Sequence, residues 1–194
     1  CWPHLCFLNC TASMTEPQIT IRRFQGHECD ALFEAARESF AEISPWMSWL
    51  DENYTLKTAR EWVQSREKAW NNNESYDFAI TDADGRFVGV VGLNALDFTS
   101  KRANFGYWVR TSCAGRGVAV IASRQLIDLA FADEPPFEAR LHRLEILVAV
   151  PNTKSHRVAQ KLNAVREGIL RVRLWPDGHP QDAVMYSLLK TDAR

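Results

Sequence analysis

The residues best suited to chemistry form a loop, Ala114-Gly115-Arg116-Gly117-Val118-Ala119, between a predicted strand and a predicted helix. Small residues let backbone N–H groups approach an anion, and the partial positive charge at a helix N-terminus stabilises that anion. Such a loop can hold a pyrophosphate without a metal ion. The spacing is neither G-x-G-x-x-G nor Gly-Lys-Ser/Thr, which excludes a dinucleotide fingerprint and a P-loop. Two glycines are equally compatible with a simple turn.

Two further groups have side chains that suit a binding site. Asn152-Thr153-Lys154-Ser155 directly follows an apolar strand. Asn152 is a good helix N-cap, and its amide and the Ser155 hydroxyl can also contact a ligand at the end of that strand. The aromatic residues Trp46 and Trp49 either belong to the core or line the cleft of an acceptor.

Composition limits the class of protein. The 194 residues carry a formal net charge of -1, which gives no electrostatic reason to expect a nucleic-acid or anionic-membrane partner. No apolar run approaches the roughly 20 residues that span a bilayer. The five cysteines include no C-x-x-C pair, which argues against a disulfide framework and favours a cytoplasmic location. No His, Cys, Asp and Glu cluster has zinc-ligand spacing, so we expect no metal.

The elements that must position these residues alternate along the chain. We expect residues 1–13 to be a disordered tag or upstream extension, and residues 14–194 to form one domain. Strands are expected at 19–24, 76–81, 87–93, 103–109, 143–150, 165–174 and 183–189. Helices are expected at 28–40, 58–70, 152–162 and from the glycine loop to about 132. This pattern predicts a mixed α/β domain with about seven strands and about four helices. Residues 144–150 are nearly all apolar, which is typical of a strand buried on both faces.

Four stretches in this order give the chain a family resemblance. They are Pro45-Trp46-Met47-Ser48-Trp49-Leu50, Gly106-Tyr107-Trp108-Val109, Val150-Pro151-Asn152-Thr153-Lys154-Ser155 with Lys161-Leu162 and Glu167-Gly168 behind it, and Val184-Met185-Tyr186-Ser187-Leu188-Leu189. From about Ile19 to Leu189 the chain resembles the GCN5-related N-acetyltransferases (GNAT), and within them the RimL-like branch, which acetylates protein N-terminal amines. The resemblance implies a mostly antiparallel sheet in which the fourth and fifth strands splay apart.

The resemblance also implies where acetyl-CoA binds. The pantetheine arm would lie between the strands 103–109 and 143–150 like an added strand. Backbone N–H groups of Gly115, Arg116, Gly117, Val118 and Ala119 would hold the pyrophosphate, with the Arg116 side chain as a charged donor. Amides near Trp108 and Val109 would bind pantetheine, and one of them could polarise the thioester oxygen. Asn152 would bind the same arm, and Ser155 would lie near the sulfur.

The sequence departs from the family pattern at the positions that move protons. The family's tyrosine acid falls at Ala159, so Ser155 is the candidate in its place. The glutamate often found on the fourth strand falls at Asn104, a catalytic-site position whose amide cannot act as a base. The loop begins with Ala114 where Gln or Arg is usual. The remaining candidate bases are Glu42, Asp51, Asp97 and His142. Trp46, Trp49 and Tyr107 are expected to contact the acceptor.

These observations predict direct transfer of acetyl from acetyl-CoA to a primary amine, without a metal or a covalent intermediate. The leading acceptor is the N-terminal α-amine of a protein or peptide. The alternatives are a small amine such as a polyamine, an amino-acid-like compound or an antibiotic, a non-catalytic acyl-CoA-binding module, and a plain interaction domain. A ring of acids around the cleft would favour a polyamine. A homodimer through the strand Val184–Leu189 is left open.

Overall fold

The described part of the chain, residues 17–132, 140–176 and 178–192 of a computed structural model, contains both strands and helices. The predicted extension at 1–13 lies outside these residues. The strands are β1 (Ile19–Arg23), β2 (Ser75–Asp82), β3 (Phe87–Asp97), β4 (Arg102–Val109), β5 (Arg143–Ala149), β6 (Val165–Leu174) and β7 (Gln181–Leu189). The α-helices are α1 (Cys29–Glu38), α2 (Phe40–Ile43), α3 (Leu56–Asn71), α4 (Val118–Phe131) and α5 (Thr153–Lys161), with short 3-10 turns at Ser44–Trp46 and Thr111–Cys113. No helix in this part of the chain is long and apolar enough to cross a membrane.

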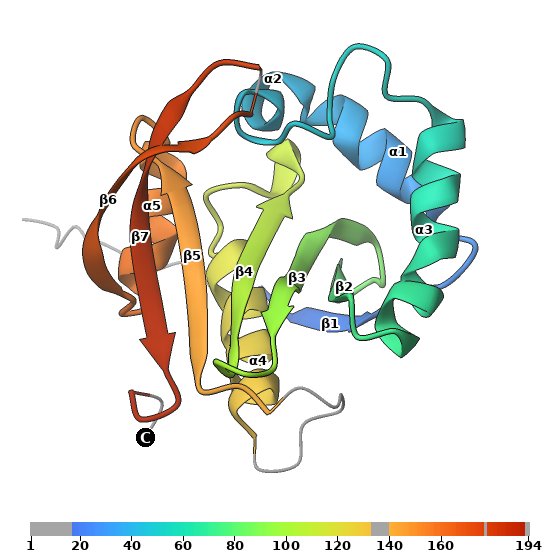
Figure 1. Cartoon of the computed structure of the whole chain (residues 1–194). Helices are drawn as coiled ribbons and strands as arrows, with labels where there is room; N and C mark the ends of the chain where they lie inside the picture. Colours follow the sequence, from blue (N-terminus) through green and yellow to red (C-terminus); the bar gives the residue numbers. More distant parts are fainter. Residues whose placement is uncertain (1–16, 133–139, 177, 193–194) are drawn as a thin grey trace, which may run out of the picture.

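The strands form a single sheet in the order β1-β2-β3-β4-β5-β7-β6 (Figure 1). All neighbours are antiparallel except β4 and β5, which run parallel. The mixed α/β architecture and the mostly antiparallel sheet predicted from the sequence are therefore confirmed. Because β7 lies between β5 and β6, its backbone is paired on both sides, and β6 forms the edge of the sheet.

Helices cover the two faces of the sheet and create two apolar cores. On one face, α3 packs on β2 and α1 on β3; on the other, α4 packs on β1, β3 and β4, and α5 on β5. Helix α4 buries Val118, Ala122, Leu126 and Ala130, which recur every four residues and so form one stripe along it. That stripe contacts the inward-facing residues of β3, β4 and β5 in the larger core.

The structure differs from the sequence-based expectations in the end of β3, the start of α3 and the burial of β5. Strand β3 continues beyond Leu93 to Asp97, with a shift in register after Asn94 where Ala95 adopts a φ of 48°. Helix α3 begins before Thr58 because the Thr55 hydroxyl accepts a hydrogen bond from the Thr58 N–H at 3.2 Å and caps it. Strand β5 is not buried on both faces as predicted. Leu144, Ile146 and Val148 are buried, whereas Arg143, Glu145 and Leu147 lie half-buried on the other face.

Candidate active site

Strands β4 and β5 pair over only a short stretch. Arg102, Ala103 and Asn104 face Arg143, Leu144 and Glu145, and the two strands then separate (Figure 1). Beyond this point β4 stays paired to β3 as far as Val109, and β5 stays paired to β7 as far as Ala149. The inner edge of each strand therefore presents backbone N–H and C=O groups that do not pair across the sheet. These edges suit an extended ligand that carries amides of its own.

The glycine loop leads into an uncapped helix. Gly115 and Gly117 adopt φ values of 78° and 86°, a region in which a side chain would be strained. Gly117 stands directly before α4, and neither a side-chain cap nor an acidic residue is present in the first turn of the helix. Arg116 is exposed beside it. Because the first N–H groups of a helix lack intrahelical partners, this helix start fits a pyrophosphate.

Ser155 lies opposite Tyr107 across the separation between β4 and α5. The Tyr107 hydroxyl is 2.8 Å from the Ser155 Oγ and donates to the Ser155 carbonyl oxygen at 3.2 Å. Burial raises the pKa of Tyr107 to about 12, so its phenol stays neutral at physiological pH. The Asn152 side-chain oxygen accepts the Ser155 N–H at 3.1 Å and caps α5. One turn further on, Ala159 is fully buried in the core.

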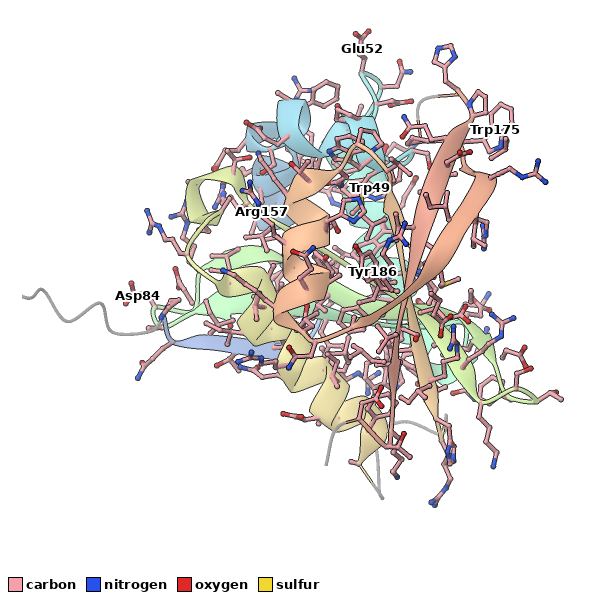
Figure 2. All side chains as sticks on the ribbon, turned by 90° about the vertical axis from the view of Figure 1, so that its left-hand side faces the viewer. Trp49, Glu52, Asp84, Arg157, Trp175 and Tyr186 are labelled. Carbon is pink, nitrogen blue, oxygen red and sulfur yellow. The ribbon has the colours of Figure 1, made fainter. Side chains whose placement is uncertain are left out.

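Helix α5 is held against the end of β5 and against β7 by His156. Its Nδ1 is 3.0 Å from the Tyr186 hydroxyl and its Nε2 is 3.1 Å from the Val150 carbonyl oxygen. Figure 2 shows this side of the molecule, with α5 in front and Tyr186 and Arg157 labelled. These two contacts fix the position of Ser155 along the separated strands β4 and β5.

A cavity of about 300 Å³ lies on the other face of the sheet, between α3 and strands β2 to β4. Its walls combine aromatic and apolar side chains with a smaller polar group. They are Leu32, Met47, Trp49, Tyr54, Thr58, Trp62, Arg66, Ser75, Asp77, Val90, Gly92, Asn94, Gly106, Tyr107 and Trp108. Because Gly106, Tyr107 and Trp108 also belong to the stretch of β4 that is not paired to β5, the cavity meets the separated strands there.

The residues expected to contact the acceptor fall into two groups. Trp49 and Tyr107 line the cavity, although the Tyr107 hydroxyl is turned toward Ser155. Trp49 is 41% exposed and its ring lies 5.9 Å from that of Trp108, which is almost fully buried. Trp46 is half-buried in the 3-10 turn and is not among the lining residues. Asn104 donates to the Asn94 side-chain oxygen at 3.0 Å, beside the cavity.

The four candidate bases all lie outside the cavity lining. Glu42 accepts the Thr111 hydroxyl at 3.1 Å, and Asp51 accepts the Asn53 N–H at 2.8 Å. Asp97 accepts the Ser100 N–H at 2.8 Å, which lowers the pKa of its carboxyl group. His142 is exposed just before β5.

The acid that does line the cavity is Asp77, which was not among the residues expected from the sequence. The available signal was Ser75-Tyr76-Asp77, in which two polar residues alternate with an aromatic residue inside a strand. Only the pairing of β2 with β3 shows which face of the sheet Ser75 and Asp77 occupy.

The corner between α1 and α2 connects the cavity side of the molecule to the glycine loop. The Ser39 hydroxyl accepts the Thr111 N–H at 3.0 Å, and Glu38 accepts the Ser112 N–H at 3.0 Å. Glu38 also pairs with Arg110 at 2.6 Å. These contacts fix the chain that leads from β4 into the anion-binding loop.

The fold and the site define an acyltransferase class. Residues 18–165 match the family model described as acetyltransferase (GNAT) domain, so the chain belongs to the GNAT acetyltransferase family and is an N-acetyltransferase that uses acetyl-CoA.

Two curated relatives indicate its place in that family. It is 30% identical over 177 residues to "Putative ribosomal N-acetyltransferase YdaF" of Bacillus subtilis, with 90% of this chain and 92% of that protein covered. It is 24% identical over 143 residues to spermidine N(1)-acetyltransferase of Vibrio cholerae, with 74% and 79% covered.

A solved structure shares the fold. The Microcin C7 self immunity acetyltransferase MccE, in complex with acetyl-CoA and AMP, superposes with a TM-score of 0.80 at 21% identity, covering 91% of this chain and 94% of that chain. In the described ranges of the present chain, no group of three His, Cys, Asp or Glu side chains is placed to hold a metal ion.

Proposed function

We propose that the acceptor of this N-acetyltransferase is the N-terminal α-amine of a protein or peptide. The observation that carries the proposal is that the cavity is lined by Gly106, Tyr107 and Trp108, in the stretch of β4 that is not paired to β5. An amine held in the cavity thus approaches the strand edge along which the acyl donor would bind. The similarity to YdaF, a protein named for ribosomal acetylation, supports the same acceptor class.

Each predicted cofactor residue has a separate task in this reaction. The N–H groups from Gly115 to Ala119, with Arg116, would bind the pyrophosphate, and the edges of β4 and β5 would bind the pantetheine arm. Acetyl-CoA supplies an activated thioester. The amine nitrogen bonds to the acyl carbon as the carbon–sulfur bond breaks, one proton leaves the amine, and CoA thiol is released.

Ser155 and Tyr107 would handle the departing sulfur. The Ser155 hydroxyl can donate to a thiolate, and the neutral Tyr107 phenol can then donate its single proton to the Ser155 Oγ in place of the Ser155 carbonyl oxygen. This arrangement takes the place of the family's tyrosine, whose position is the buried Ala159. It stabilises developing charge and does not require Tyr107 to ionise.

The relation to a spermidine acetyltransferase favours a polyamine as the second candidate acceptor. A polyamine carries several positive charges and calls for several acids in the cleft. Among the described residues, the cavity lining contains one acid, Asp77, and Arg66 neutralises it at 2.6 Å. This charge balance supports a peptide α-amine over a polyamine.

The test combines binding and turnover in the same protein. Calorimetry with acetyl-CoA is followed by release of CoA thiol with peptides bearing a free α-amine, the same peptides N-terminally blocked, and spermidine. We expect release with the free peptides and none with the blocked ones. Release with spermidine alone would contradict the proposed acceptor, and acetyl-CoA binding without release on any amine would indicate a binding module.

A further inference from the structure

The corner between α1 and α2 lies beside the end of β4 and carries polar side chains whose partners are far away in the sequence (Figure 1). Ser39 is fully buried and occupies the N-cap position of α2, where a serine hydroxyl ordinarily accepts a backbone N–H of its own helix. Its hydroxyl makes no such bond. It accepts the N–H of Thr111, the first residue of the 3-10 turn Thr111–Cys113, at 3.0 Å. The local structure of the corner therefore does not account for the direction of the Ser39 side chain.

Two glutamates of the same corner contact the same turn. Glu38 accepts the Ser112 N–H at 3.0 Å through Oε1 and pairs with the buried Arg110 at 2.6 Å through Oε2. Glu42 accepts the Thr111 hydroxyl at 3.1 Å. Burial raises the pKa of Glu38, but the hydrogen bonds with Ser112 and the charge of Arg110 lower it overall, so this carboxylate is ionised at neutral pH.

Backbone hydrogen bonds divide this segment of the chain into an occupied part and a free part. Every N–H from Arg110 to Ala114 has a partner, and these partners are, in order, the Val88 carbonyl, the Ser39 hydroxyl, the Glu38 carboxylate, the Arg110 carbonyl and the Thr111 carbonyl. From Gly115 to Val120, no N–H donates to any of the described residues. A ligand with several acceptor oxygens, such as a pyrophosphate, therefore finds free backbone donors in this segment only from Gly115 onward.

Ser39 and Glu38 determine where the occupied part ends. Without them, the first two N–H groups of the turn would have no partner, and the turn would lose its attachment to α1. The same corner also belongs to the acceptor side, because Leu32 on α1 and Met47, directly after the 3-10 turn Ser44–Trp46, both line the cavity. The corner thus fixes the glycine loop relative to the cavity in which the amine would be held.

We propose that Ser39 and Glu38 are positioning residues for the acyl donor, which fix the turn before the glycine loop and thereby set where the pyrophosphate of acetyl-CoA binds. The inference rests on the proposed role of the glycine loop. Each of the two side chains acts through a backbone N–H that it holds, not by contact with the donor. Removing either one should therefore weaken binding of the nucleotide half of CoA and leave binding of the pantetheine arm unchanged.

The first experiment measures two dissociation constants by calorimetry. CoA is titrated directly, and pantetheine, which has the arm without the nucleotide and its pyrophosphate, is measured in competition with CoA. For Ser39→Ala we expect the dissociation constant of CoA to rise about fivefold or more, since a buried N–H loses its partner and the turn is no longer held. The constant for pantetheine should not change.

Ser123→Ala is the matched control. Ser123 is also fully buried, and its hydroxyl has no hydrogen-bond partner among the described residues, so the same substitution removes no contact. This variant should bind both ligands like the unaltered protein.

The outcomes separate the inference from the proposed role of the loop. Unchanged CoA affinity in Ser39→Ala would overturn the inference. Equal weakening of CoA and pantetheine would also overturn it, because it would indicate a general loss of structure. If the unaltered protein bound CoA no more tightly than pantetheine, the glycine loop would not hold the pyrophosphate and its proposed role would fail. Should Ser39→Ala not fold, Glu38→Gln decides.

Glu38→Gln tests the second residue through the sign of its effect. The change removes a negative charge near a site for an anion, which by itself would favour CoA. An amide has one acceptor oxygen where the carboxylate uses two, so the contact with Ser112 or with Arg110 is lost. If Glu38 positions the turn, the dissociation constant of CoA rises about threefold or more, and that of pantetheine stays the same. Tighter CoA binding would refute its role. Glu34→Gln, an exposed position one turn earlier on α1, controls for net charge and should change neither constant.

Discussion

At the scale of single residues, Ser155 and Tyr107 would together take the place of the tyrosine acid that the family resemblance implies at the position of Ala159. Ser155 lies at the start of a short helix whose cap, Asn152, fixes its backbone. Tyr107 lies on a strand of the central sheet, so its hydroxyl has a fixed position. A donor held rigidly by two elements loses little conformational entropy when charge develops nearby.

This arrangement predicts that Ser155→Ala lowers turnover more than affinity. We expect kcat to fall on the order of 10- to 100-fold, since one hydrogen bond to a developing thiolate is lost. Calorimetry with CoA should give a dissociation constant close to that of the unaltered protein. Tyr107→Phe is the companion variant and should have a smaller effect, because its hydroxyl acts through Ser155. Unchanged kcat in Ser155→Ala would show that Ser155 has only a structural role at the start of α5.

Some of these candidate residues could be named from the sequence, and others could not. The glycines of the loop, Asn152 and Ser155 could be named from the sequence, because each has a defined local position beside the end of a strand or helix. Asp77 and Arg66 could not, because their meeting depends on the packing of α3 on β2. The direction of the Tyr107 hydroxyl likewise depends on where α5 lies, which no local pattern encodes.

At the scale of elements, the loop before α4 combines a required backbone conformation with an exposed helix start. Gly117 has a φ of 86° and its Cβ position meets only the end of the Ile121 side chain, at 3.9 Å. A large side chain there would therefore be strained and would also stand over the first N–H groups of α4.

We predict that Gly117→Trp abolishes measurable CoA binding, as recorded by calorimetry. Gly85→Trp is the matched control, because Gly85 has a φ of 77°, meets nothing within 4 Å and lies in the hairpin between β2 and β3. Both variants should lose stability on the order of 1 kcal/mol from backbone strain. Only Gly117→Trp should lose affinity. Normal CoA binding by this variant would show that the loop does not hold the pyrophosphate.

Most elements were predicted from the sequence because apolar periodicity and turn residues define them locally. Gly85 and the preceding Asp84 marked the hairpin, and the glycine loop marked the start of α4. The extension of β3 to Asp97 was missed because the change of register after Asn94 interrupts the alternation that a sequence pattern follows. The half-buried face of β5 was missed because burial depends on which helices cover the sheet, not on the composition of the strand.

At the scale of the whole molecule, the sheet consists of two parts that share little backbone pairing. Strands β1 to β4 and strands β5 to β7 meet only where Arg102–Asn104 pair with Arg143–Glu145. A network of charged side chains crosses this junction. Arg102 contacts Asp97 at 3.4 Å and Glu145 at 2.9 Å, and Arg143 contacts Glu145 at 2.8 Å. The network lies at the end of the gap where β4 and β5 are still paired. The acyl donor would bind in the rest of this gap.

The outer end of this network predicts how stability depends on pH. Glu167 accepts two hydrogen bonds from Arg143, at 2.7 and 2.5 Å, and one from the Ser187 hydroxyl at 2.7 Å. These bonds lower the pKa of Glu167 from 4.5 to about 2, with those from Arg143 contributing most. The unfolded chain binds the proton more tightly, so the ionised carboxylate stabilises the fold above pH 4.5. This contribution is lost as the pH falls toward 2.

We therefore predict that Glu167→Gln makes the free energy of unfolding less dependent on pH between 4.5 and 2. Because the Glu167 side chain is 39% exposed, solvent screening should keep the loss at neutral pH below about 1 kcal/mol. Urea unfolding at several pH values measures both quantities, and Asp84→Asn, at the tip of the distant β2–β3 hairpin, is the control (Figure 2). If Glu167→Gln and the unaltered protein lost stability in parallel on acidification, the ion pair between Glu167 on β6 and Arg143 on β5 would not contribute to the stability of the fold.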